Sequence, residues 1–271
     1  MHPDHGDPAA PQLRSTGAPD HDGVGPTGLL PTGPQADDAL ARLYRWPDGD
    51  GATVVRANMI ASLDGATTLD GRSGGLGNAA DEYLFTLLRD LADVILVGSG
   101  TVRAERYGGI RLTPERADRR TRWGLSTAPP PIAVVTARGL DPGSPLFADT
   151  VTPPIVITTE SGARRVPDGV AAIAVGAERV DLAAGLVALH RAGLGRVHCE
   201  GGPSLLASLA EDDLVDELCL TISPLLLGAG EAAMLPRRLT HPLRWSLQGA
   251  HVAGDHVFTR YRRHPARAAT P

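Results

Sequence analysis

Two glycine-containing segments carry the residue types best suited to holding a phosphate group. The run CEGGPSL at 199–205 places two glycines before a proline that can open a helix. The run VGSGT at 97–101 follows an apolar stretch directly. Glycine lets the backbone approach a ligand closely, and a helix N-terminus offers free N–H groups to an anion. Both segments are therefore candidate phosphate loops, although a tight strand-to-helix turn without a ligand would use the same residues.

Other polar residues follow strand-like runs at positions where they could meet a substrate or cofactor. Ser62 and Asp64 lie in the run ASLDG at 61–65, and a hydroxyl and a carboxylate there can orient a polar heterocycle. Arg138 follows Thr136 at the end of another run, and its guanidinium suits a ribose 2′-phosphate. Each of these segments is also compatible with an ordinary polar turn.

Composition excludes several kinds of chemistry. All 26 basic residues of the 271 are arginine, so a Schiff-base enzyme and a lysine-dependent phosphate loop are both ruled out. The net charge of −5 argues against a nucleic-acid surface, and no apolar run approaches the length of a membrane helix. Cys199 and Cys219 lie in apolar runs without metal-ligand spacing, which indicates buried thiols and no metal site. We expect a cytoplasmic protein.

The elements that must position these residues alternate between strand and helix. Helices are expected at 79–91, with Asn78 as N-cap, at 182–192, with Asp181 as N-cap, and after Gly202. Strands are expected at 54–60, 94–97, 132–135, 155–159, 171–175, 196–199 and 218–222, followed by a hairpin at 243–262 that turns at Gly254-Asp255. This order predicts an α/β fold with a mostly parallel central sheet flanked by helices and a C-terminal antiparallel hairpin.

The division of the chain follows from composition. Residues 1–36 are rich in proline and glycine, which predicts a disordered leader. One domain is expected over 37–263 and a flexible tail over 264–271, while the arginine- and proline-rich stretch 113–131 is expected to be an exposed loop.

Several ordered motifs resemble the bacterial pyrimidine reductase family, which includes the C-terminal reductase domain of the riboflavin-biosynthesis bifunctional deaminase–reductase. The motifs are ANMIASLDG at 57–65, LRDLADVILVGSGTVR at 88–103, EGGPSLL at 200–206, DELCLTISP at 216–224 and Leu227-Gly228. The resemblance implies a dihydrofolate-reductase-like fold, NADPH as cofactor, a homodimer, and reduction of the ribosyl group of 5-amino-6-(5-phosphoribosylamino)uracil.

The resemblance also implies roles for individual residues. Asn58, Ser62, Asp64 and Arg103 are expected to bind the substrate, and Asp64 and Glu105 are the candidate proton donors. The residues expected to bind the cofactor are Gly98, Ser99, Gly100, Thr101, Thr136, Arg138, Glu200, Gly201, Gly202, Pro203, Ser204 and Leu205.

The sequence departs from the family pattern at three positions of the expected site. Ala66 stands where the family usually has a lysine, Glu105 where it commonly has an aspartate, and Tyr107 where a proline often follows. The deaminase zinc motif does not occur. Two alternatives stay open at this point: a dihydrofolate or pterin reductase of the same fold, and a non-catalytic NADPH-binding protein.

Overall fold

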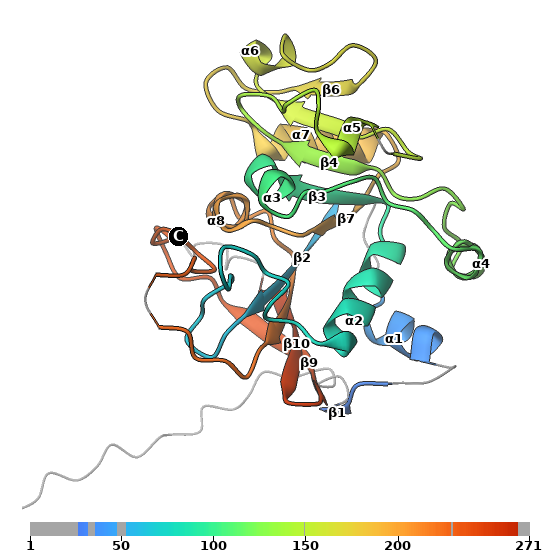
Figure 1. Cartoon of the computed structure of the whole chain (residues 1–271), viewed down its shortest axis with the longest axis vertical. Helices are drawn as coiled ribbons and strands as arrows, with labels where there is room; N and C mark the ends of the chain where they lie inside the picture. The colour runs from blue at the N-terminus through green and yellow to red at the C-terminus, as the bar shows by residue number, and fades with distance from the viewer. Residues whose placement is uncertain (1–26, 32–35, 48–52, 149, 229, 265–271) are drawn as a thin grey trace, which may run out of the picture.

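The computed structural model describes residues 27–31, 36–47, 53–148, 150–228 and 230–264. Within them, ten strands form one sheet in the order β1-β9-β10-β8-β2-β7-β3-β4-β5-β6, which can be followed in Figure 1 from β1 at the bottom to β6 at the top. The strands are β1 (Thr27–Leu29), β2 (Val54–Ala61), β3 (Val94–Gly98), β4 (Ile132–Val135), β5 (Ile155–Thr158), β6 (Ala171–Ala174), β7 (Arg196–Cys199), β8 (Glu217–Ile222), β9 (Trp245–Ala253) and β10 (His256–Arg263). The helices are α1 (Ala36–Leu43), α2 (Ala79–Asp90), α3 (Ser99–Ala104), α4 (Pro114–Arg122), α5 (Pro145–Ala148), α6 (Glu160–Ala163), α7 (Leu182–Arg191) and α8 (Pro203–Glu211).

The pairing of the strands confirms the expected sheet. From β8 to β6 every neighbouring pair is parallel. The hairpin β9–β10 adds antiparallel strands next to β8 and turns at Gly254, whose φ is +60°. Parallel strands bury both faces. Successive residues of β3 accordingly alternate between two apolar cores: Ile95 and Val97 pack with α1 and α2, and Val94 and Leu96 pack with α7 and α8.

Capping residues in the sequence determine where helices α2 and α7 begin. The side-chain oxygen of Asn78 accepts hydrogen bonds from the N–H groups of Ala80 and Asp81, both at 3.0 Å, and this fixes the first turn of α2. Asp181 caps α7 in the same way through the N–H of Ala184. Both N-caps were expected from the sequence, and the structure confirms them.

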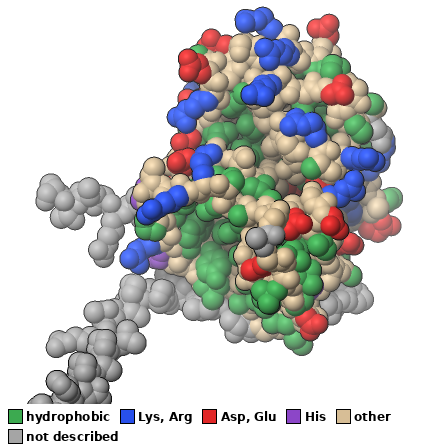
Figure 2. Space-filling view, turned by 60° about the vertical axis from the view of Figure 1, so that its left-hand side comes forward, with side chains coloured by type: hydrophobic (Ala, Val, Ile, Leu, Met, Phe, Trp, Pro, Cys, Tyr) green, Lys and Arg blue, Asp and Glu red, His purple; other side chains and the backbone are tan. Residues whose placement is uncertain are grey.

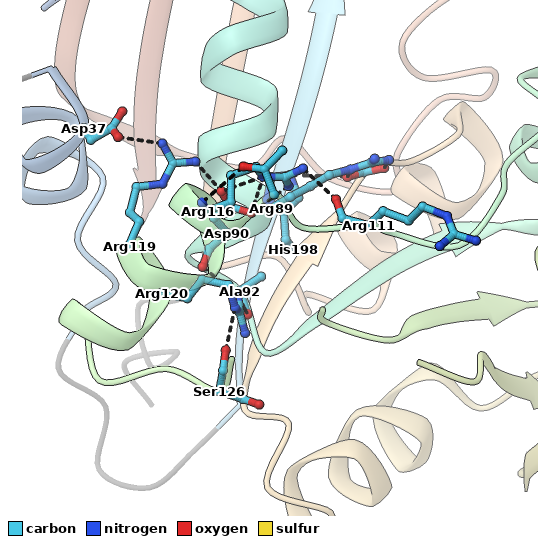
Figure 3. Close-up of polar contacts among 12 residues, drawn as sticks. Asp37, Arg89, Asp90, Ala92, Arg111, Arg116, Arg119, Arg120, Ser126 and His198 are labelled. Carbon is cyan, nitrogen blue, oxygen red and sulfur yellow. Dashed lines mark hydrogen bonds and ion pairs between the residues drawn. The ribbon is translucent and has the colours of Figure 1, made fainter. Parts of the chain in front are cut away.

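The expectation of a loop over 113–131 is wrong, because this stretch contains α4. Thr113 caps the helix and Pro114 occupies its first turn. Figure 3 shows Arg119 extending from α4 to Asp37 and Asp90, and Arg116 also pairs with Asp90, at 2.7 Å. Asp90 is fully buried, so these arginines hold the helix through tertiary contacts that composition does not reveal.

The predicted leader lies mostly outside the described residues. Its described part, however, belongs to the fold: Thr27–Leu29 forms β1 beside β9, and Ala36 begins α1 and is buried. The N–H of His264 donates a hydrogen bond to the carbonyl of Arg244, and the rest of the predicted tail, 265–271, lies outside the described residues. No helix in the described part of the chain is long and apolar enough to cross a membrane.

Candidate active site

A cavity of about 470 Å³ lies at the carboxyl ends of β2, β3 and β7. The end of β2 contributes Asn58 to its lining, the first turns of α2 contribute Asp81 and Phe85, and α3 and α8 contribute their first turns. Figure 2 shows apolar side chains gathered around the hollowed centre of the face that lies to the left in Figure 1. The carboxyl edge of a parallel sheet is where α/β proteins bind ligands.

The two glycine segments lie side by side at this cavity. The N–H of Gly98 donates a hydrogen bond of 2.8 Å to the carbonyl of Gly201. A Cβ atom on Gly202 would lie 2.5 Å from the Thr101 Oγ1, so a side chain at this position would displace the Thr101 hydroxyl where the two segments meet. The predicted adjacency of the two segments is confirmed.

Most residues of the two glycine segments line the cavity, but two do not. Its lining contains Gly98, Gly100, Thr101, Glu200, Gly202, Pro203, Ser204 and Leu205. Ser99 and Gly201 belong to the same two segments but do not line the cavity. Helix α8 begins at Pro203, which has no N–H, so Ser204 and Leu205 supply the N–H groups of the first turn that have no acceptor within the helix, and both residues line the cavity.

Glu200 forms a buried charged cluster in the wall of the cavity. Its carboxylate accepts two hydrogen bonds from Arg89, at 2.6 and 2.7 Å, and one from the Tyr107 hydroxyl, at 2.6 Å. Burial by itself raises the pKa of Glu200, but the Arg89 guanidinium, together with His198 and the Tyr107 hydroxyl, outweighs it and holds the pKa below its ordinary value. Glu200 is therefore ionised, and both of its carboxylate oxygens accept hydrogen bonds from protein side chains.

Tyr107 and His198 are the titratable neighbours of Glu200. Burial raises the pKa of Tyr107 well above its ordinary value, and the Glu200 carboxylate raises it further. His198, on the same strand end, is fully buried 3.8 Å from Glu200, and burial lowers its pKa to about 4. Near neutral pH, His198 and Tyr107 are therefore both neutral, and the Arg89–Glu200 pair carries the charge.

Ser62 and Asp64 join two loops and do not line the cavity. The Ser62 hydroxyl donates to Asp64 at 2.5 Å, and the N–H groups of Leu227 and Gly228 donate to the same carboxylate at 3.2 and 2.6 Å. These hydrogen bonds, that of Ser62 first, lower the pKa of Asp64 to about 2. Asp64 is thus an anion at neutral pH, and its observed contacts hold the loop after β2 against residues 227–228.

The other candidates from the sequence are spread along the same edge of the sheet. Glu105 lines the cavity and accepts hydrogen bonds from the N–H and hydroxyl of Ser73, at 2.9 and 3.0 Å. Arg103 is exposed on α3 and does not line the cavity. Thr136 bonds to the carbonyl of Gly139, and Arg138 is exposed after β4, the neighbour of β3. The structure therefore brings Glu105 and Asn58 into the cavity and leaves these two arginines outside it.

Sequence reasoning missed Asp81. Its half-buried carboxylate lines the cavity from the first turn of α2, and burial raises its pKa above the ordinary value. The capping residue Asn78 located this turn in the sequence, but the side of the helix that faces the cavity depends on the packing of α2 against the sheet.

The model of the family described as the RibD C-terminal domain matches residues 53–258, which include every residue of the cavity. The chain belongs to this family. This RibD C-terminal domain is 35% identical over 190 residues to the 2,5-diamino-6-ribosylamino-4(3H)-pyrimidinone 5′-phosphate reductase of Archaeoglobus fulgidus, which covers 66% of this chain and 83% of the relative. It is 29% identical over 220 residues to the reductase of the same name from Methanothermobacter thermautotrophicus, covering 73% and 95%.

Solved structures agree with the RibD C-terminal domain fold. A pyrimidine reductase-like protein from Corynebacterium diphtheriae aligns with a TM-score of 0.73 at 27% identity, over 83% of this chain and 98% of that one. The riboflavin biosynthesis reductase Rib7 of Saccharomyces cerevisiae shares the fold, with a TM-score of 0.64 at 18% identity, over 85% of this chain and all of that one. The family, the α/β fold with a mostly parallel sheet and the oxidoreductase class expected from the sequence are confirmed.

Proposed function

We propose that this protein reduces the ribosyl group of a 6-(5-phosphoribosylamino)pyrimidine to a ribityl chain, using NADPH. The observation that carries the proposal is the joining of the two glycine segments by Gly98 and Gly201 at the mouth of a cavity large enough for a small ligand. The names of the two archaeal relatives supply the substrate class, a ribosylamino-pyrimidinone 5′-phosphate.

The residues at the glycine segments fit a dinucleotide. Because Gly202 has no Cβ atom, the backbone there can lie close to Thr101. The first turn of the nine-residue helix α8 can donate N–H groups to a diphosphate. NADPH bound there would supply the hydride. The exposed guanidinium of Arg138 is our proposed contact for the 2′-phosphate that distinguishes NADPH from NADH, and Thr136 holds the turn that carries it.

The substrate side of the proposed site belongs to Asn58 and Glu105, which line the cavity. The amide of Asn58 can exchange hydrogen bonds with the pyrimidine, and Glu105 can accept them from ribosyl hydroxyls. Ser62 and Asp64 contribute by holding the loop that follows β2. Arg103 lies on α3, whose first turn borders the cavity, and is our proposed contact for the substrate phosphate.

Steady-state kinetics test this function. The purified chain is mixed with NADPH and, separately, with the 2-amino and the 2-oxo forms of the substrate and with dihydrofolate. We expect loss of reduced nicotinamide and a product heavier by two hydrogens with at least one pyrimidine. Turnover of dihydrofolate alone would contradict the proposal in favour of a pterin reductase, and NADPH binding without turnover would favour a binding protein.

We also propose that the protein forms a homodimer. Leu63 and Leu226 are large apolar side chains that are 59% and 74% exposed, on two loops joined by a hydrogen bond from the N–H of Leu63 to the carbonyl of Leu225. Exposed apolar side chains of this kind are typical of a surface that is covered by a partner. Sedimentation equilibrium would give twice the mass of the chain, and a monomer at micromolar concentration would contradict the proposal.

A further inference from the structure

Reduction of a C=N or C=O bond requires a proton as well as a hydride, and this chain has no lysine to supply it. The titratable side chains that line the cavity are Asp81, Glu82, Glu105, Tyr107 and Glu200. Glu200 is kept ionised by Arg89, and the Tyr107 hydroxyl donates a hydrogen bond to Glu200. Neither of these two groups is therefore a ready proton donor to a substrate.

We propose that Asp81 is the proton donor of the reduction. This inference rests on the proposed function and names the group that supplies its proton. It differs from the expectation that Asp64 or Glu105 plays this part.

The position of Asp81 in the helix directs its carboxylate into the cavity. The N–H of Asp81 donates to the Asn78 side chain at 3.0 Å, which fixes this residue in the first turn of α2. Phe85 follows one helical turn later and also lines the cavity, so both residues lie on the cavity side of the helix. Gly77 leaves room for the carboxylate, because a Cβ atom there would lie 2.8 Å from the Asp81 Oδ2.

The surroundings of Asp81 favour its protonated form. Among the described residues, no ion pair joins Asp81 to an arginine, in contrast to Glu200 and Asp90. Burial raises its pKa, the Thr221 hydroxyl and His256 lower it, and the neighbouring Glu82 raises it. Both ring nitrogens of His256 have other partners, Nε2 the Leu76 carbonyl and Nδ1 the Asn78 side-chain amide.

The chemical step balances with groups already named. Opening of the ribosyl ring breaks the C1′–O4′ bond, moves the amine proton to O4′ and leaves a C=N bond between C1′ and the amine nitrogen. A new C–H bond forms at C1′ with the hydride, and the π electrons of the C=N bond move to the nitrogen. An N–H bond forms there as the O–H bond of Asp81 breaks. The nicotinamide is oxidised, the substrate is reduced, and the Asp81 carboxylate recovers its proton from solvent.

The test compares Asp81→Asn with Asp118→Asn, a matched change at an exposed residue of α4. In wild type without ligands, carboxyl ¹³C NMR should show the Asp81 signal titrating above the ordinary aspartate value of 3.8. We expect Asp81→Asn to lower kcat by about 10²–10⁴-fold with NADPH affinity unchanged, and Asp118→Asn to leave kcat unchanged. Asp81→Glu should restore part of kcat, because it keeps an acid at the same place.

The pH profile separates a proton donor from a residue that only binds or supports the fold. Wild-type kcat should fall as pH rises through the pKa of Asp81, and Asp81→Asn should lack this limb while keeping a native circular dichroism spectrum. Full kcat in Asp81→Asn, a change in KM alone, or an Asp81 signal that titrates at or below the ordinary aspartate value would each overturn the inference. If wild type reduces no pyrimidine, the proposed function fails instead, whatever the NMR titration gives.

Discussion

The N–H of Gly98 donates a hydrogen bond of 2.8 Å to the carbonyl of Gly201, and this bond joins two segments that are about one hundred residues apart in the sequence. Because β3 and β7 are adjacent parallel strands, the loops that follow them leave the sheet at the same edge. The bond places the start of α3 beside the start of α8, and both border the cavity. In our account, this edge holds the cofactor.

Gly202→Ala should weaken NADPH binding by at least about tenfold, corresponding to about 1.4 kcal/mol. The added Cβ atom would lie 2.5 Å from the Thr101 Oγ1 and must push this side chain out of its place in the loop. Fluorescence titration with NADPH measures the effect. Gly108→Ala is the control, since nothing lies within 4 Å of the corresponding Cβ atom. Equal NADPH affinities for the two variants would contradict a dinucleotide cradle formed by the two glycine segments.

Arg89→Met should destabilise the fold by about 3–5 kcal/mol at neutral pH, because it leaves the fully buried Glu200 carboxylate without its charge partner. Urea unfolding gives the free energy. Arg237→Met removes the partner of Glu211 in an exposed ion pair and should cost at most about 1 kcal/mol. Similar decreases in the free energy of unfolding of the two variants would show that the buried Arg89–Glu200 pair stabilises the fold no more than an exposed ion pair does.

Asp64 should make the joined loops sensitive to acid. Its pKa is lowered from 3.8 to about 2 in the folded protein, so its contribution is complete above the ordinary value and is lost as pH falls through the folded value. The protection factors of the N–H groups of Leu227 and Gly228, which correct for the intrinsic pH dependence of exchange, should therefore fall between about pH 4 and pH 2. Asp64→Asn should show low protection at both ends of this range, and high protection in that variant would contradict the role of the carboxylate.

Asp90→Ala should release α4, because Arg116 and the buried Arg119 both pair with this fully buried carboxylate. The cost should be about 3–5 kcal/mol, and exchange of the amides in α4 should rise most. Asp118→Ala changes an exposed aspartate on the same helix and should leave both measurements nearly unchanged. Unchanged protection of α4 in Asp90→Ala would show that other contacts hold the helix.

The sequence predicts the parts of the site that depend on local signals. Apolar runs followed by glycines locate the strand ends at Gly98 and Gly201, and parallel order then requires them to share an edge. The proline and cap that begin α4 were present in the sequence, but its arginine-rich composition resembled a solvated loop. Its buried partner Asp90 lies more than twenty residues away, and only the tertiary structure brings the two together.

The same limit applies to the carboxylates at this edge of the sheet. Asp64 belongs to a recognisable motif, yet its partners Leu227 and Gly228 lie more than 160 residues along the chain. Asp81 belongs to no motif, and its raised pKa results from burial, which outweighs the lowering effects of Thr221 on β8 and His256 on β10. The sequence therefore located the loops, while the protonation states of their carboxylates required the packed structure.

The most direct test of the central claim is amide hydrogen exchange of the purified chain with and without NADPH. The account predicts that NADPH slows exchange at residues 98–101 and 202–205 together, with little change in α4. Protection confined to one segment, or appearing away from both, would contradict a shared dinucleotide cradle at Gly98 and Gly201.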